Sequence, residues 1–179
     1  MSAAAEAAPK SDPRVDDKRG ASIALLVVSL IGLILGVVLT IQHYTGGELA
    51  GCSSTGFFNC DLVNHSIYSE VRSLPVALLG AITYLLTAGL AFTRWRRGPA
   101  AAGSAAYAFT LACLAVLLSG FLGWKSKTEL GTFCLYCLGL YATNLALFAT
   151  SWMALGGPAH WLPAMKADWQ ELGSMRVSD

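Results

Sequence analysis

The stretch Phe133-Cys134-Leu135-Tyr136-Cys137-Leu138-Gly139-Leu140-Tyr141 decides the fold, because it places two cysteines at the start of a long apolar segment. Residues three apart on a helix share one face, with Cβ atoms about 5–6 Å apart, which is close to the separation that a disulfide spans. A cysteine in the first helical turn also lies at the positive end of the helix dipole, which favours the reactive thiolate. The stretch therefore predicts a redox-active dithiol where a helix enters a membrane.

The composition indicates a small membrane protein. The chain has 179 residues, of which 55% are hydrophobic and only 13% are charged. Soluble domains carry about 25% charged residues, so half that value points to lipid as the solvent. A net charge of +1 gives no sign of a nucleic-acid partner, and we expect none.

Four apolar segments are long enough to cross a hydrocarbon core of about 30 Å at 1.5 Å per residue. They cover residues 21–41, 74–93, 102–124 and 133–155. We therefore expect an all-α bundle of four transmembrane helices over residues 21–155. Residues 1–20 are predicted to be a disordered tail, and residues 156–179 a second tail that includes a short surface helix.

The basic residues predict the orientation, because cytoplasmic connections of membrane proteins are enriched in lysine and arginine. The N-terminal tail has four such residues and the connection after the second segment has three, whereas the first loop has only Arg72. Lys125 and Lys127 in the third connection argue weakly for the opposite orientation. We expect both termini in the cytoplasm and both cysteine pairs on the opposite, oxidising side.

The loop between the first two segments holds Cys52 and Cys60. One interpretation is a static disulfide, which stabilises such a short loop by about 2–3 kcal/mol. The other is a relay, in which Cys52 exchanges with an external protein thiol and Cys60 passes electrons to the Cys134/Cys137 pair. Exchange requires only that a thiolate reaches a sulfur in line with the breaking bond, which a flexible loop allows.

Electrons on Cys134 and Cys137 need an acceptor, and at membrane depth a quinone is an apolar two-electron carrier that matches a dithiol. Cys137 lies one turn deeper and should face the quinone, whereas Cys134 should face the loop. Two alternatives are cysteines that only pack in the core and a zinc site. Zinc sites usually draw four ligands from ordered loops, and no histidine adjoins this apolar pair, so we expect no metal.

Tyr141 and Asn144 share the helix face of Cys137. A phenol or an amide inside a membrane is costly unless it is hydrogen-bonded. Either residue could donate to a quinone carbonyl or bond to another helix, and the latter is favoured for Asn144. Cys113 is expected to pack in the core. His43 and His65 are expected to be solvated, with a proton-carrying role for His65 as the alternative.

These residues together resemble the vitamin K epoxide reductase (VKOR) family. The last apolar segment reads Cys-x-x-Cys-x-x-x-Tyr-Ala-x-Asn, the pattern of that family's catalytic helix. The loop reads Cys-x7-Cys, followed by Val63, Ser66 and Tyr68 at offsets similar to the family's. The start of the second segment also matches, and the resemblance covers residues 20–155. The matching positions of that segment are Pro75, Val76, Ala77, Gly80 and Tyr84.

The resemblance implies a four-helix membrane fold in which Cys137 contacts the quinone and Cys134 exchanges with Cys60. Cys52 would take electrons from a thioredoxin-fold (DsbA-like) protein. Ser66, Tyr68 and Tyr141 would form or cover the quinone pocket. Asp61 is similar to an acidic residue common in bacterial members and would position the loop.

Three departures from the family pattern stand out. Arg72-Ser73 replaces the Phe-Gly that usually precedes Leu-Pro in bacterial members. Val76 occupies the position of a quinone-contacting asparagine in the animal branch, which argues against epoxide reduction. The chain reaches Asp179 with neither the fifth helix nor the thioredoxin-like domain of many bacterial members, so the partner is expected to act in trans.

The sequence therefore predicts a thiol:quinone oxidoreductase of a bacterial inner membrane that supports disulfide formation. The quinone would be of the menaquinone, ubiquinone or vitamin K type. The DsbB type of disulfide generator also has four helices, but its CxxC lies between the first two spans, so the VKOR order fits better. Two alternatives are a thiol-driven vitamin K epoxide or quinone reductase, and a non-catalytic redox sensor or assembly protein with structural cysteines.

Overall fold

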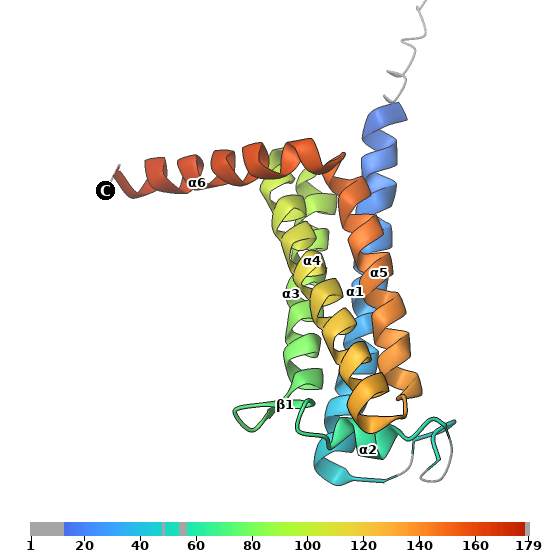
Figure 1. The fold of residues 1–179 in the computed structure, drawn as a ribbon. Helices are drawn as coiled ribbons and strands as arrows, with labels where there is room; N and C mark the ends of the chain where they lie inside the picture. Colours follow the sequence, from blue (N-terminus) through green and yellow to red (C-terminus); the bar gives the residue numbers. More distant parts are fainter. Residues whose placement is uncertain (1–12, 48, 54–56, 178–179) are drawn as a thin grey trace, which may run out of the picture.

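Four long helices run alternately up and down and form a bundle (Figure 1). The computed structural model describes residues 13–47, 49–53 and 57–177. Within these residues, four helices are long and apolar enough to cross a membrane, which confirms the predicted all-α membrane bundle. They are α1 (Pro13–Thr45), α3 (Val76–Arg97), α4 (Ala102–Lys125) and α5 (Leu135–Leu155).

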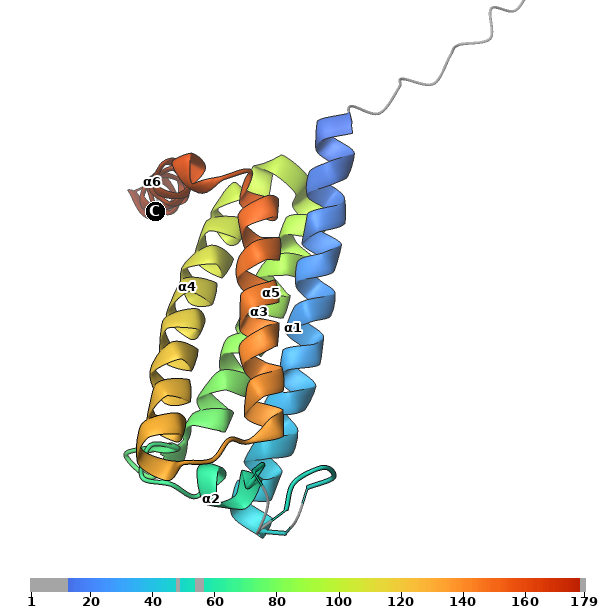
Figure 2. The ribbon, with the colours of Figure 1, turned by 45° about the vertical axis from the view of Figure 1, so that its right-hand side comes forward.

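The connections place the cysteines at one end of the bundle. The first loop folds into the short helix α2 (Cys60–Asn64) and a hairpin of β1 (Glu70–Val71) and β2 (Leu74–Pro75). One π-helical turn, η2 (Ser126–Leu130), extends α4 at this same end. We call this the cysteine end, and the opposite end, where α1 begins and α3 stops at Arg97, the basic end (Figure 2).

The basic end carries three further helical segments. They are η1 (Gly98–Ala101), η3 (Pro158–His160) and α6 (Trp161–Val177). α6 runs away from the bundle, across the direction of the four long helices (Figure 1). A helix is therefore present in the tail predicted over residues 156–179, and its placement on the membrane surface stays a prediction.

α1 begins earlier than the sequence predicted. The disordered tail was expected to reach residue 20, but residues 13–20 are helical, so the prediction is wrong for them. The sequence places Pro13 at the first helical position and Asp16 and Asp17 in the next turn, which are favoured residue types at a helix N-terminus. The remainder of that predicted tail, residues 1–12, lies outside the described residues.

α1 packs closely along α3 because two glycines face that helix. A Cβ on Gly32 would overlap the ring of Tyr84, and one on Gly36 would lie 3.2 Å from the backbone of Ala81. Small residues let transmembrane helices approach one another. Gly32 therefore makes room for the Tyr84 side chain, which is buried in the centre of the bundle.

Arg94 stabilises the basic end. Its side chain is buried and donates hydrogen bonds to the carbonyl oxygens of Gly98 and Ala154, at the ends of α3 and α5. The C-terminal carbonyls of a helix carry partial negative charge, so a guanidinium is a favourable partner for them. This contact joins the ends of two spans that are distant in the sequence.

Candidate functional site

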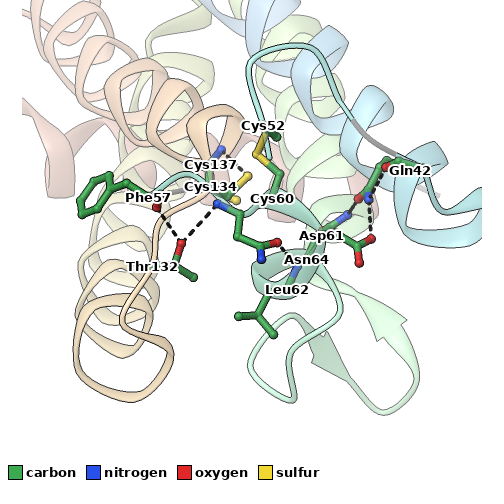
Figure 3. The surroundings of a disulfide bond; sticks show 12 residues. Gln42, Cys52, Phe57, Cys60, Asp61, Leu62, Asn64, Thr132, Cys134 and Cys137 are labelled. Atoms are coloured by element: carbon green, nitrogen blue, oxygen red, sulfur yellow. Dashed lines mark hydrogen bonds between the residues drawn. A yellow bond between two sulfur atoms is a disulfide. The ribbon is translucent and has the colours of Figure 1, made fainter. Parts of the chain in front are cut away.

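The loop cysteines and the helix cysteines differ in bonding. Cys52 and Cys60 form a disulfide with a Cα–Cα distance of 5.6 Å. Cys134, Cys137 and Cys113 are free thiols. The thiols of Cys134 and Cys137 lie beside the loop disulfide in Figure 3. The structure thus shows an oxidised loop pair next to a reduced helix pair.

The sequence predicted Cys134 in the first turn of the helix. In the structure it lies just before that turn, as the residue that caps the helix. Its backbone is extended (φ −100°, ψ 123°), and its Sγ accepts a hydrogen bond of 3.3 Å from the Cys137 N–H. A thiol that caps a helix satisfies a backbone donor that otherwise has no partner. The Cys137 thiol and the N–H groups of Cys137 and Tyr136 hold the pKa of Cys134 below its ordinary value, against the effect of burial.

The four cysteines differ in how deeply they are buried. Cys60 and Cys134 are each 1% exposed and belong to one buried cluster with Leu39 and Val63. Cys52 and Cys137 lie at the border of this cluster and are partly exposed. The two buried cysteines therefore belong to one cluster, against which the two more accessible cysteines pack.

A cavity of about 240 Å³ lies beneath the loop, between α3, α4 and α5. Of the four cysteines, Cys137 alone lines it, together with all four residues that the sequence predicted for a quinone. Most of the remaining wall is aliphatic, with leucines from α3 and α4. Apolar walls with a few polar groups are typical of small-molecule sites. The four predicted residues are Ser66, Tyr68, Tyr141 and Asn144.

Two of these residues lie on α5 but have different surroundings. The amide of Asn144 accepts a 2.5 Å hydrogen bond from the Tyr84 hydroxyl and donates a 2.7 Å bond to Ser119, so it connects α3, α4 and α5. This confirms the interhelical bond favoured for Asn144. Within the described part of the chain, no residue accepts a hydrogen bond from the Tyr141 hydroxyl. Tyr141 therefore has a donor available to a molecule in the cavity.

The family assignment agrees with this geometry. A family model described as the vitamin K epoxide reductase family matches residues 23–152, well over half of the chain. The chain belongs to the vitamin K epoxide reductase family. Members are thiol-dependent oxidoreductases of quinones or epoxides, and they generally work in a membrane with a thioredoxin-like partner. No curated protein matches the chain.

The loop that covers the cavity in this VKOR family member is held by polar contacts that the sequence did not reveal. The side chain of Asn64 is buried in α2 and donates to the carbonyl of Leu39 and to the amide oxygen of Gln42. Gln42 in turn donates a 3.1 Å hydrogen bond to Asp61. Polar residues in the last turns of an otherwise apolar span were the available signal, because α1 places Leu39, Gln42 and His43 together.

The two histidines are more constrained than the sequence suggested. The His43 side chain is only 8% exposed, so the expectation of solvation is wrong for it. It bonds to the Asn64 carbonyl at 2.7 Å and lies 3.2 Å from the Glu70 carboxylate. His65 stacks on His43, and although partial burial opposes it, hydrogen bonds to His43 and Asp61 raise the pKa of His65 above its ordinary value.

The departures from the family pattern fall at defined places. Arg72 and Ser73 form the two-residue turn of the hairpin and both have positive φ, 51° and 66°. Such turns favour Asn-Gly, because residues with a Cβ resist this conformation. Val76 lines the cavity and supplies no hydrogen-bond donor or acceptor from its side chain.

Two further predictions concern Cys113 and metal binding. Cys113 packs against the core cluster between the helices, as the sequence predicted. Within the described residues, no group of three or more histidine, cysteine, aspartate or glutamate residues is arranged to hold a metal ion.

Proposed function

We propose that this VKOR family member is a thiol:quinone oxidoreductase. It takes electrons from a thioredoxin-fold, DsbA-like protein in trans through Cys52 and Cys60, passes them to Cys134 and Cys137, and delivers them to a quinone. The product outside the membrane is an oxidised partner that introduces disulfides into other proteins. We place the protein in a bacterial inner membrane, and the distribution of Lys and Arg supports an orientation with both termini in the cytoplasm.

The observation that supports this proposal most strongly is the difference in burial among the four cysteines. Cys52 is accessible from the loop, Cys60 and Cys134 share a buried cluster, and Cys137 borders the cavity. Electrons that enter at Cys52 thus have a protected sequence of sulfurs to the cavity. A purely structural disulfide would not need free thiols packed against it.

The first half-reaction consists of thiol–disulfide exchanges. A thiolate of the reduced partner attacks Cys52, which breaks the Cys52–Cys60 bond and releases Cys60 as a thiolate. Cys60 then attacks Cys134 of an oxidised Cys134–Cys137 pair and releases Cys137. The second partner thiol frees Cys52, which recovers Cys60 and leaves Cys134 reduced. Each step forms one S–S bond and breaks another, so the partner gains the disulfide that the helix pair loses.

The second half-reaction takes place at the cavity. Two electrons and two protons from the Cys134/Cys137 dithiol reduce a quinone to a quinol, and an S–S bond forms between the two cysteines. The Tyr141 hydroxyl donates a hydrogen bond to a quinone carbonyl, while Ser66 and Tyr68 close the cavity on the loop side. Asn144 fixes the wall through Tyr84 and Ser119. The lowered pKa of Cys134 favours its thiolate, the form released when Cys52 recovers Cys60.

The cavity fits the head of a menaquinone, ubiquinone or vitamin K type quinone better than a whole lipid. Its volume of about 240 Å³ is below the range of about 300–1,000 Å³ for pockets that enclose complete drug-sized ligands. An isoprenoid tail would therefore extend from the cavity toward the bilayer. Exposed Leu114 and Leu118, which line it from α4, provide an apolar exit.

The test is quinone reduction by the purified protein with a reduced thioredoxin-fold protein as electron donor, followed by quinone absorbance. Cys137→Ala should reduce turnover to the rate of the reaction without enzyme, because no thiol remains at the cavity. Cys113→Ala removes a cysteine that packs in the core and should retain turnover. Quinone reduction that survives in Cys137→Ala would contradict the proposal.

A further inference from the structure

Two short chain segments pair with each other, one just before Cys60 and the other just before Cys134. Phe58 and Phe133 form a parallel bridge, in which the Phe133 N–H donates to the Phe57 carbonyl at 3.3 Å. Cys60 begins α2 directly after one segment, and Cys134 caps α5 directly after the other. The register of this short pairing therefore determines where the two cysteines lie relative to each other.

Thr132 holds the pairing in register. Its hydroxyl donates a 2.7 Å hydrogen bond to the Phe57 carbonyl and accepts a 3.2 Å bond from the Asn59 N–H (Figure 3). The residue is 7% exposed, so water does not readily replace these bonds. One buried hydroxyl thus contacts the loop on both sides of Phe58, immediately before Cys60.

Both sides of this contact are fixed to the rest of the protein. Ser126 in η2 donates a 2.5 Å hydrogen bond to the Thr132 carbonyl, which anchors Thr132 to the end of α4. The Asn59 side chain accepts from the Leu62 N–H and so caps α2, the helix that begins with Cys60. The hydrogen bonds therefore run from α4 through Thr132 to the helix that carries the loop cysteine.

We propose that Thr132 is a positioning residue for electron transfer, whose hydroxyl sets Cys60 against Cys134 for thiol–disulfide exchange. The inference rests on the proposed function, since it concerns the internal exchange step of that relay. Exchange requires three sulfur atoms close to a line, so a shift of the loop slows it even when both cysteines remain buried. A misplacement of about 1 Å can reduce the rate of a reaction by up to about a hundredfold.

The test measures formation of the Cys60–Cys134 bond directly, without quinone or partner. In the full chain with Cys52→Ala, Cys137→Ala and Cys113→Ala, the remaining cysteines are Cys60 and Cys134. Limiting copper-phenanthroline oxidises them, and the rate of disulfide formation is followed by alkylation and gel shift. We expect Thr132→Val to slow this bond by about tenfold to a hundredfold, since valine has the shape of threonine but cannot hydrogen-bond.

Three further variants make the test specific. Thr132→Ser keeps the hydroxyl and should restore most of the rate. Ser126→Ala removes the anchor on the other side and should slow the bond by less than Thr132→Val. Thr128→Val is a matched control, because Thr128 is exposed and its hydroxyl bonds only within its own helical segment, to the Trp124 carbonyl.

Several results would overturn the role of Thr132: equal rates in Thr132→Val and its parent, a Thr132→Ser rate as slow as that of valine, or equal slowing in Thr128→Val. A parent that forms no Cys60–Cys134 bond overturns both this role and the relay. If the natural protein fails to reduce quinone while the variants keep the expected order of rates, the proposed function alone is wrong.

Discussion

The two cysteine pairs of this protein use the same chemistry in different settings. Cys52 and Cys60 are bonded to each other on a loop, whereas Cys134 and Cys137 are free thiols where α5 begins. The helix pair has a capped backbone, a neighbouring cavity and a free tyrosine hydroxyl, none of which adjoins Cys52. This difference fits the proposal that the loop pair receives electrons from a partner protein and that the helix pair delivers them to a membrane substrate.

The largest effect is expected when Cys60, the buried cysteine of the loop pair, is removed. Cys60→Ala should abolish quinone reduction driven by a thioredoxin-fold protein, because no sulfur then connects Cys52 with Cys134. Reduction driven by dithiothreitol, a small dithiol, should be partly retained. Quinone absorbance under both donors measures this, and equal loss with both would argue that Cys60 has another role.

The Tyr141 hydroxyl tests the role proposed for the helix pair. Tyr141→Phe removes a cavity-lining hydroxyl that has no hydrogen-bond acceptor among the described residues, and we expect kcat/KM for quinone to fall by about tenfold, the value of one hydrogen bond. Tyr44→Phe is the matched control, since Tyr44 is exposed at the end of α1 and outside the cavity. Equal effects of the two substitutions would exclude a specific role for the Tyr141 hydroxyl.

The pKa of Cys134 tests whether its partner thiol activates it. Because Cys137 holds the Cys134 pKa below its ordinary value, the Cys134 thiolate persists to lower pH than that of an ordinary cysteine and is lost as the pH falls through the lowered pKa. Cys137→Ala should shift this loss to higher pH, whereas Cys137→Ser, which keeps a donor, should shift it less. The absorbance of the thiolate near 240 nm measures both pH shifts when protein that retains the Cys52–Cys60 disulfide is titrated. Identical titrations would contradict the hydrogen-bond explanation.

The smallest expected effect concerns the loop that covers the cavity. Ser73→Gly should raise the free energy of unfolding by up to about 1 kcal/mol, because glycine adopts the positive φ of the hairpin turn without steric cost. Thermal unfolding in detergent measures this. The matched control is Ser53→Gly, because Ser53 lies in the same loop before Cys60 but is not among the residues with positive φ. Equal shifts in both variants would show that the turn is not strained.

The sequence was sufficient for the bundle and for the cavity residues on α5, because helical periodicity places Cys137, Tyr141 and Asn144 on one face. It could not place Cys134, since a capping residue and a first-turn residue look alike in an apolar run. It also missed Thr132 and Asn64, whose partners lie on other segments. Hydrogen bonds between distant segments leave no periodic pattern in a sequence, and His43 was misjudged for the same reason.

The central claim is that electrons pass from Cys60 to Cys134, and a trapped disulfide tests it most directly. Cys52→Ala leaves Cys60 without its loop partner, so after quinone has oxidised Cys134 and Cys137, Cys60 can exchange with Cys134. Acid quenching, alkylation and peptide mapping should then find a Cys60–Cys134 disulfide and a free Cys137. A free Cys60 together with an intact Cys134–Cys137 disulfide would contradict the relay.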